Sequence, residues 1–440
     1  MRSVCQASSG EILMRPSPSI GRRFAHYSAV LISCSLLFGF AHSQTYSVLY
    51  TFTGNGLNGR PFYPNSGLVM NSGGILFGTT LRGGSAENGS AFQLKRAGSG
   101  WVLNLLYSFQ GGTDGIDPEA GLTISPSGVL YGTTGAGGDT SCGISNGCGT
   151  VYILRPPATA PRTTEIPWNE TVLYRFHGST DGSEPGNGRV VLDSAGNLYG
   201  TTQYGGDMVD CSSLGGCGTV YQLSPSGIET VLYAFDVFNG KDGYGPSGGV
   251  IFDSGGNLYG TNQPTVYQLV PAGGSWTENI LYNFQTESFA TGSGNYTSLL
   301  NSGGNLYGVT QSYGASGPGG GGTVYELGTS GGFNLLYDFG TTRLSTTGPE
   351  GPLVMDAAGN LYGVSFFGGV NGVGSVYKLS PSGGGWTYTD LYDFTGLSDG
   401  GGPVGNLVID SAGNLYGTTC CNGGSNGGEG GVIFEISLNQ

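Results

Sequence analysis

The stretch Asp193–Thr202 reads D-S-A-G-N-L-Y-G-T-T, and versions of its last seven letters, G-N-L-Y-G-T-T, occur seven times in the chain. The aromatic residue of each copy is Phe77, Tyr131, Tyr199, Tyr259, Tyr307, Tyr362 or Tyr416. Successive copies lie between 48 and 68 residues apart. A unit that recurs with such a period indicates a repeat architecture, in which every copy forms the same supersecondary element.

The opening residues of this stretch predict a tight hairpin turn. Asp193 can accept hydrogen bonds from nearby backbone N–H groups, and Gly196 can take a positive φ. The D-x-x-G-N pattern is found again at Asp253, Asp356 and Asp410. Because these carboxylates recur in step with the repeat, we assign them to turns and not to catalysis.

Three other apolar segments share the register of the motif. A short G-L-V strand precedes each copy, a G-T-V-Y-x-L strand follows it, and an L-Y-x-F strand completes the set. The tyrosines of the L-Y-x-F strands are Tyr50, Tyr107, Tyr174, Tyr233, Tyr282, Tyr337 and Tyr392. Four strands in each of seven repeats predict an all-β fold, a seven-bladed β-propeller of four-stranded antiparallel blades.

The order of the strands predicts how the ring closes. The first L-Y-x-F strand, at Val48–Phe52, precedes every G-L-V strand, and the chain ends just after the strand at Val432–Ile436. If G-L-V lies innermost, the last blade lacks its fourth strand, and Val48–Phe52 supplies it. Closure of this kind leaves no exposed sheet edge. The alternative is seven contiguous blades with L-Y-x-F innermost.

These repeat units resemble a known family. D-x-x-G-N-L-Y-G-T-T, G-T-V-Y-x-L and L-Y-x-F look like the GloVer tandem repeat of exported bacterial proteins, from Ser47 to Ile436. More distantly they resemble the blades of sensor-type and gluconolactonase-like propellers, in which the G-L-V strand lies by the central channel. The resemblance therefore favours closure by the N-terminal strand. It implies export and a surface or extracellular setting, but no established activity, so it transfers no catalytic residue.

The N-terminal segment predicts an export signal. Arg22 and Arg23 precede an apolar run at Ala29–Ala41, and Ala41-His42-Ser43 fits a cleavage site. We therefore divide the chain into a signal peptide, 1–43, and a propeller, 44–440. No second long hydrophobic segment follows, so we expect a secreted or cell-surface protein without a transmembrane segment in its mature chain.

Composition narrows the possible partners. Glycine provides 88 of 440 residues, charged residues make up 10%, and the formal net charge is −14. Such an acidic chain excludes a broad phosphate-binding surface, and we expect no nucleic-acid partner. We expect a monomer.

The cysteines after residue 43 predict disulfides. Cys142 and Cys148 are six residues apart, as are Cys211 and Cys217, in equivalent loops of neighbouring repeats. In an exported chain this spacing favours two local disulfides. A four-cysteine zinc site that bridges the loops is the alternative. For the adjacent pair Cys420 and Cys421 we expect a vicinal disulfide, with free thiols or intermolecular bonds as alternatives.

The strand order sorts the connections onto two ends of the ring. The D-x-x-G-N turns and the links after G-T-V-Y-x-L lie at one end, which we name the turn end. The loops after G-T-T and the links after L-Y-x-F lie at the other. We name this the variable end, because its G-T-T loops differ widely in length. Variable loops on a rigid scaffold are where binding sites usually occur.

Blade 3 offers a candidate ligand site on the variable end. Its long loop, Tyr204–Cys217, stands beside the short Gln263-Pro264 loop of blade 4, which predicts a recess. Tyr204, Asp207 and Asp210 would line its high side, and the two aspartates do not recur with the repeat. An aromatic face and two carboxylates suit a sugar and its hydroxyls, and the carboxylates also suit calcium.

The leading functional prediction is a non-enzymatic extracellular protein that binds a glycan, a cell-wall component or a protein at the variable end. The alternative is an enzyme that acts on a polysaccharide or a lactone through carboxylates at the same end. The carboxylates of that end are Asp114, Asp117, Glu119, Asp181, Glu184, Asp207, Asp210, Asp242, Glu350 and Asp399. Clustered, non-periodic carboxylates at the channel mouth would favour the enzyme. His177 is the only histidine after residue 43, which excludes a histidine-rich metal site. We assign no catalytic residue and, apart from calcium, no cofactor.

Overall fold

The fold is known from a computed structural model. It describes residues 44–53, 59–157, 167–185, 188–209, 211–212, 215–236, 242–287, 292, 294, 297–314, 320–340, 347–421 and 430–438. Residues 1–43 lie outside this part of the chain, so the export signal stays a prediction. Within the described residues, no helix has both the length and the apolar character needed to cross a membrane.

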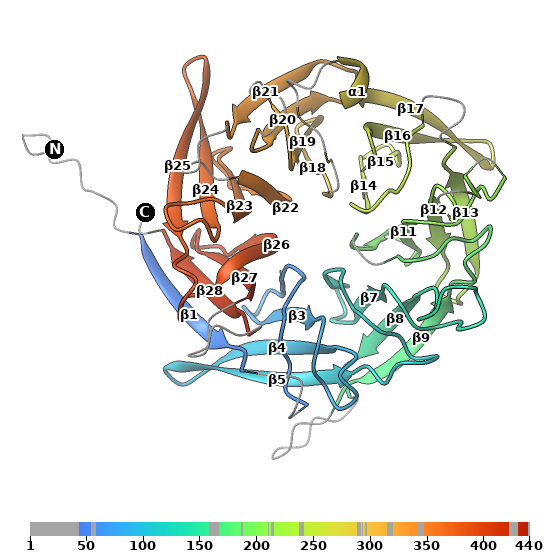
Figure 1. Ribbon diagram of the computed structural model, residues 1–440, viewed down its shortest axis with the longest axis horizontal. Helices are drawn as coiled ribbons and strands as arrows, with labels where there is room; N and C mark the ends of the chain where they lie inside the picture. The colour runs from blue at the N-terminus through green and yellow to red at the C-terminus, as the bar shows by residue number, and fades with distance from the viewer. Residues whose placement is uncertain are drawn as a thin grey trace, which may run out of the picture. The chain divides into compact units, whose positions relative to one another are not determined.

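The described strands form seven antiparallel sheets of four strands, arranged as blades in a ring (Figure 1). Blade 1 contains β2 (Val69–Met70), β3 (Leu76–Thr80), β4 (Ser90–Ala97) and β5 (Gly100–Ser108). Blade 2 contains β6 (Thr123–Ile124), β7 (Leu130–Thr134), β8 (Thr150–Arg155) and β9 (Asn169–Arg175). Blade 3 contains β10 (Val191–Leu192), β11 (Leu198–Thr202), β12 (Thr219–Leu223) and β13 (Glu229–Ala234).

The remaining blades repeat this order. Blade 4 contains β14 (Val250–Phe252), β15 (Leu258–Thr261), β16 (Thr265–Ala272) and β17 (Ser275–Asn283), followed by the short helix α1 (Phe284–Glu287). Blade 5 contains β18 (Leu300–Ser302), β19 (Asn305–Thr310), β20 (Thr323–Gly328) and β21 (Phe333–Asp338). Blade 6 contains β22 (Thr347–Met355), β23 (Leu361–Phe367), β24 (Ser375–Ser382) and β25 (Gly385–Asp393). The predicted fold class is confirmed.

Blade 7 confirms closure by the N-terminal strand. Its strands, from rim to centre, are β1 (Thr45–Thr51), β28 (Val432–Ser437), β27 (Leu415–Cys421) and β26 (Gly401–Ile409). Tyr46 of β1 pairs with Ile436 of β28, and Val48 pairs with Phe434. The innermost strand of every blade is the G-L-V strand, as predicted (Figure 1).

The invariant glycine of G-N-L-Y-G-T-T has a packing role. Gly200 lies directly across the sheet from Tyr221, and a Cβ added at Gly200 would lie 2.5 Å from the Tyr221 hydroxyl oxygen. The fully buried Tyr221 ring therefore lies over the bare backbone of its neighbouring strand. Blades 1 and 7 have the same arrangement, with Phe92 over Gly78 and Phe434 over Gly417.

The turn aspartates have the predicted structural role. Asp193 accepts hydrogen bonds from the backbone N–H groups of Ala195 and Asn197, both at 2.9 Å, and from the Tyr199 hydroxyl at 3.1 Å. Burial acts to raise the pKa of Asp193, but the hydrogen bonds from Asn197 and Tyr199 outweigh it and hold this pKa below its usual value. Asp193 is therefore ionised, and its carboxylate accepts hydrogen bonds from residues of its own hairpin.

Candidate functional site

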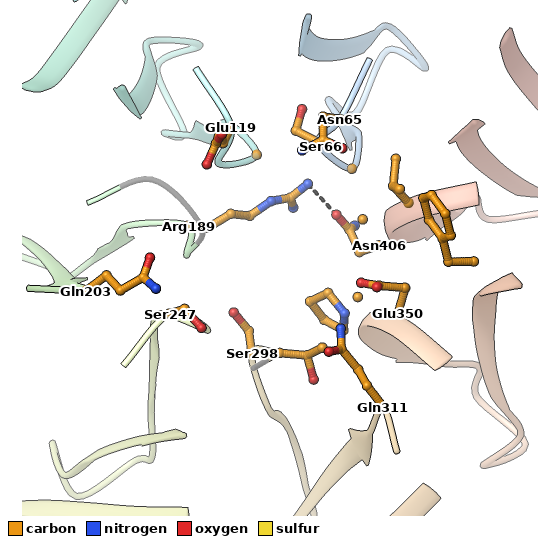
Figure 2. A pocket seen from close by; sticks show the side chains of 18 residues that line it. Asn65, Ser66, Glu119, Arg189, Gln203, Ser247, Ser298, Gln311, Glu350 and Asn406 are labelled. Carbon is orange, nitrogen blue, oxygen red and sulfur yellow. Dashed lines mark hydrogen bonds between the residues drawn. The ribbon is translucent and has the colours of Figure 1, made fainter. Parts of the chain in front are cut away.

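A cavity of about 390 Å³ opens at the centre of the ring on the variable end (Figure 2). Its walls come from residues that lead into the innermost strands and from residues that follow G-T-T. Most of the labelled side chains are polar: Asn65, Ser66, Glu119, Arg189, Gln203, Ser247, Ser298, Gln311, Glu350 and Asn406. Hydrogen-bonding groups from every blade thus converge on the mouth of the channel.

Arg189 of blade 3 reaches across this mouth. Its Nη2 donates to the backbone oxygen of Leu68 in blade 1 at 2.7 Å, and to Oδ1 of Asn406 in blade 7. The side chain passes over Gly121 of blade 2, where an added Cβ would lie 2.1 Å from Arg189 Nε. Burial lowers the pKa of Arg189 to about 10, so the guanidinium remains a cation at neutral pH.

Arg189 and Asn406 have matching positions in their repeats. Each directly precedes the first apolar residue of a G-L-V strand, where the other repeats have small residues or proline: Gly67, Gly121, Gly249, Ser298 and Pro352. Glycine at position 67 is required, because a Cβ there would lie 2.4 Å from the backbone nitrogen of Asn406. Sequence reasoning missed this pair, although a search for departures from the repeat could have found it.

Two glutamates flank the cavity. Burial raises the pKa of Glu350 to about 7, against a hydrogen bond from Gln311 that lowers it. Burial also raises the pKa of Glu119, assisted by the charges of Asp117 and Glu184 and opposed by Arg82. Neither Glu350 nor Glu119 contributes to the shift of the other, and Figure 2 shows them on different sides of the mouth. They do not form a coupled carboxylate pair.

A second cavity, of about 320 Å³, shares Glu119 and Gln203 with the first. It lies between the variable-end loops of blades 2 and 3. Its other walls include Glu184 and the segment Ile144–Gly147, which belongs to the Cys142–Cys148 loop. The second cavity therefore extends the central one outward, beneath a loop that the cysteine pair constrains.

The predicted site in blade 3 lies beside the cavities, since Tyr204 follows Gln203, which lines both. Tyr204 pairs with Ser183 in an isolated antiparallel β-bridge. Burial, together with the charge of Glu184, raises the pKa of the Tyr204 hydroxyl. Asp207 accepts a hydrogen bond from the backbone N–H of Val209 at 2.8 Å. Neither residue lines the two cavities of the variable end. Asp210 lies outside the described residues, so this site stays a prediction.

The cysteine pairs lie where the disulfide prediction places them. Cys142 is at bonding distance from Cys148, Cys211 from Cys217, and Cys420 from Cys421. Cys148, Cys211 and Cys217 are fully buried among the apolar residues of blades 2 to 4. The described residues contain no group of three or more His, Cys, Asp or Glu side chains placed to hold a metal ion.

Comparison with protein families gives a match over nearly the whole chain. The family model described as the Gloeobacter/Verrucomicrobia repeat matches residues 33–264 and 261–440. The chain belongs to this family. The two matched spans together contain all seven G-N-L-Y-G-T-T copies. A search of curated proteins gives no match.

Solved structures with the same fold include propellers of other proteins. The extracellular domain of a hybrid two-component system from B. thetaiotaomicron is 12% identical with a TM-score of 0.52. That match covers 90% of this chain and 40% of the other, so this chain spans less than half the length of that structure. A gluconolactonase from Xanthomonas campestris is also 12% identical, with a TM-score of 0.41 and 89% of each chain covered. Likeness at this identity shows the fold alone.

Proposed function

We propose that this propeller is a non-enzymatic extracellular binding protein, and that its ligand is a glycan or another polyhydroxylated cell-wall component held at the channel mouth. One observation carries the proposal: the central cavity on the variable end is lined by serine, asparagine, glutamine, glutamate and arginine side chains from every blade. Convergent polar groups of this kind suit a ligand that is rich in hydroxyl groups.

The extracellular setting is supported by the cysteines. Three pairs lie at bonding distance, and disulfides persist in oxidising compartments. The Cys142–Cys148 pair constrains a loop beside the second cavity. A rigid wall lowers the conformational entropy that a ligand must remove on binding.

A glycan array followed by isothermal titration calorimetry tests this function. In Ser298→Trp the indole would fill the mouth, and we expect the affinity for any array ligand to fall at least tenfold. Asp193→Ala is the matched control, because Asp193 belongs to a hairpin at the turn end and we expect its loss to lower stability only. An array without hits, or equal losses of affinity in both variants, would contradict the proposal.

The enzyme alternative has one observation in its favour. The pKa of Glu350 is raised to about 7, which suits a general acid at neutral pH. The separation of Glu350 from Glu119 argues against a carboxylate pair. Incubation of the protein with any array ligand, followed by mass spectrometry, distinguishes the two functions. Products that disappear in Glu350→Gln would establish an enzyme, whereas an intact ligand supports binding alone.

A further inference from the structure

No carboxylate of the described residues balances the charge of Arg189. Its guanidinium contacts are two neutral acceptors, the Leu68 backbone oxygen and the Asn406 side chain. Among the described residues no carboxylate forms an ion pair with it; the pairs found there join Arg82 to Asp117, Arg96 to Glu435 and His177 to Asp181. This lack of pairing is notable in a chain with 29 acidic and 15 basic residues.

Burial of an unpaired cation costs free energy unless a counter-charge arrives. The cost is visible in the lowered pKa of Arg189. Arg189 Nη1 makes no hydrogen bond to a described residue, and the guanidinium lies toward the middle of the channel mouth (Figure 2). A planar guanidinium is well suited to a carboxylate, which it binds through directed N–H donors.

We propose that Arg189 binds the carboxylate of an acidic saccharide, such as a uronic acid unit, while the surrounding serine, asparagine and glutamine side chains bind its hydroxyls. This inference rests on the proposed binding function and specifies the class of its ligand. The size of the cavity, about 390 Å³, fits one or two sugar rings, within the range of pockets for small ligands, roughly 300–1,000 Å³.

The two glutamates of the mouth are compatible with an anionic ligand. The pKa of Glu350 is raised to about 7 by burial, so this carboxyl carries a proton for much of the time at neutral pH. A protonated carboxyl is neutral and can donate a hydrogen bond. Gln311 faces Glu350, while Asp117, Glu184 and Arg82 act on Glu119. Binding of the acidic saccharide should therefore weaken as the pH rises from 6 to 8.

A purely structural role for Arg189 is the competing explanation. The side chain links blade 3 to blades 1 and 7, and such a link could simply hold the ring together. The two roles differ in what they require. A structural link needs only a donor that reaches Leu68 and Asn406, whereas recognition of an anion needs the positive charge.

Calorimetry with tri-galacturonate and with neutral galactotriose tests the proposal on the purified chain. We expect the acidic sugar to bind about tenfold more tightly, the usual size for a charge-assisted contact, and this preference to shrink in 0.5 M NaCl. Arg189→Gln should abolish the preference, Arg189→Lys should retain part of it, and thermal melts of each variant would report folding. Arg96→Gln, which removes one cation at the turn end, should leave the preference unchanged.

The outcomes separate the two proposals. Equal affinity for the acidic and neutral sugars would overturn the role of Arg189 and leave the binding function standing. A preference that survives in a folded Arg189→Gln variant would also overturn it. Competition by inorganic phosphate but not by galacturonate would assign the cation to a phosphate ester and contradict the carboxylate. No binding of any sugar, on the array or in solution, would remove the proposed function itself.

Discussion

At the outer rim of the ring, one repeat position holds carboxyl side chains in blades 2 to 4 and aromatic side chains in blades 5 to 7. The relevant position lies four residues before the L-Y-x-F tyrosine and faces the outer strand of the preceding blade. In blades 2, 3 and 4 it is Glu170, Glu229 and Glu278, whereas in blades 5, 6 and 7 it is Phe333, Tyr388 and Tyr46. We name the first three seams the carboxyl arc and the second three the aromatic arc.

In the carboxyl arc each glutamate meets an aspartate of the preceding blade. The Tyr233 hydroxyl donates to Asp242 at 2.6 Å and lies 3.2 Å from Glu278. Burial, together with the charge of Asp242, raises the pKa of Glu278 to about 8. Burial, with the neighbouring aspartates, raises the pKa values of Glu170 and Glu229 to about 7.

In the aromatic arc the same position holds a stacked ring. Ring centroids lie 4.2 Å apart for Phe333 on Tyr282 and 4.6 Å apart for Tyr388 on Tyr337. Tyr46 stacks on Tyr392 at 3.9 Å and donates a hydrogen bond to the Asp399 backbone oxygen. The architecture requires this position to be filled and does not prescribe how, but of these six side chains only the three glutamates titrate near neutral pH.

Deletion of residues 44–53 should have the largest effect, because it removes β1, the Tyr46 stack and the outer edge of blade 7. We expect thermal stability to fall sharply, by several kcal/mol, since a whole strand and its fully buried Phe52 are lost. Differential scanning calorimetry measures the change. A variant that melts like the parent would contradict closure of the ring by β1.

The two long-loop disulfides should stabilise the carboxyl arc, since they belong to blades 2 and 3. In the loop-entropy relation a cross-link over six residues contributes about 2 kcal/mol. Peptide mapping without reduction should recover Cys142–Cys148 and Cys211–Cys217, and reduction should increase hydrogen exchange in blades 2 and 3 but not in blades 5 and 6. Free thiols at either pair would show that the prediction is wrong.

Stability should depend on pH through the carboxyl arc. A carboxyl whose pKa is higher in the folded state binds its proton more tightly there, so its contribution is complete at low pH and is lost as the pH rises through the folded pKa. With pKa values of about 7, 7 and 8, the melting temperature should fall between pH 5 and pH 8.

The triple variant Glu170→Gln, Glu229→Gln and Glu278→Gln tests this origin. Because glutamine is uncharged and can donate as a protonated glutamate does, the melting temperature should depend less on pH than in the parent. If the melting temperature of the triple variant depends on pH as strongly as that of the parent, the dependence arises from groups other than these three glutamates. Asp253→Asn is a control outside the rim, at a turn-end hairpin.

A single exchange should transfer pH dependence to the aromatic arc. Tyr46→Glu would place a carboxyl beside Tyr392 and Asp399, whose side chains already share a 3.0 Å hydrogen bond. We expect a loss of about 1 kcal/mol from the stack, and a larger loss at pH 8 than at pH 5. Tyr46→Gln should lose the stack without the added pH dependence. If the stabilities of Tyr46→Glu and Tyr46→Gln depend on pH in the same way, a carboxyl at this position does not cause the pH dependence.

The smallest expected effects concern the predicted site in blade 3. If Tyr204 and Asp207 contact a ligand of the variable end, Tyr204→Ala and Asp207→Ala should each weaken its binding by about 1 kcal/mol. Val209→Ala is the control, because Val209 is 83% exposed and lies in the same loop. Affinities equal to that of the control would restrict binding to the channel mouth.

The fold was predictable because the information is local and repeated. The hairpin of Asp193, the bare backbone at Gly200 and the strand order that pairs β1 with β28 all follow from residues close together in the sequence or from their count. The channel mouth was harder to predict. Arg189 acts on Leu68, Gly121 and Asn406, in three other blades, and the sequence gives neither the reach nor the direction of so long a side chain.

The rim carboxyls were unpredictable for a related reason. Glu278 looks like an ordinary exposed residue of a strand, and its raised pKa arises from burial and from the charge of Asp242 in the preceding blade. Such a shift depends on burial and on a neighbour that only the ring supplies. Periodicity thus reveals the scaffold, whereas the chemistry depends on residues that depart from the periodicity.

Pairing of β1 with β28 has a consequence for the folding pathway. The contact between Tyr46 and Asp399 spans 353 residues, nearly the full length of the propeller. Contacts of such high sequence separation form slowly. During synthesis the first strand to emerge must wait, unpaired, for the last. Until then β1 has no pairing partner within its own chain, so a translation pause or truncation near the C-terminus should favour strand exchange between molecules over completion of the ring.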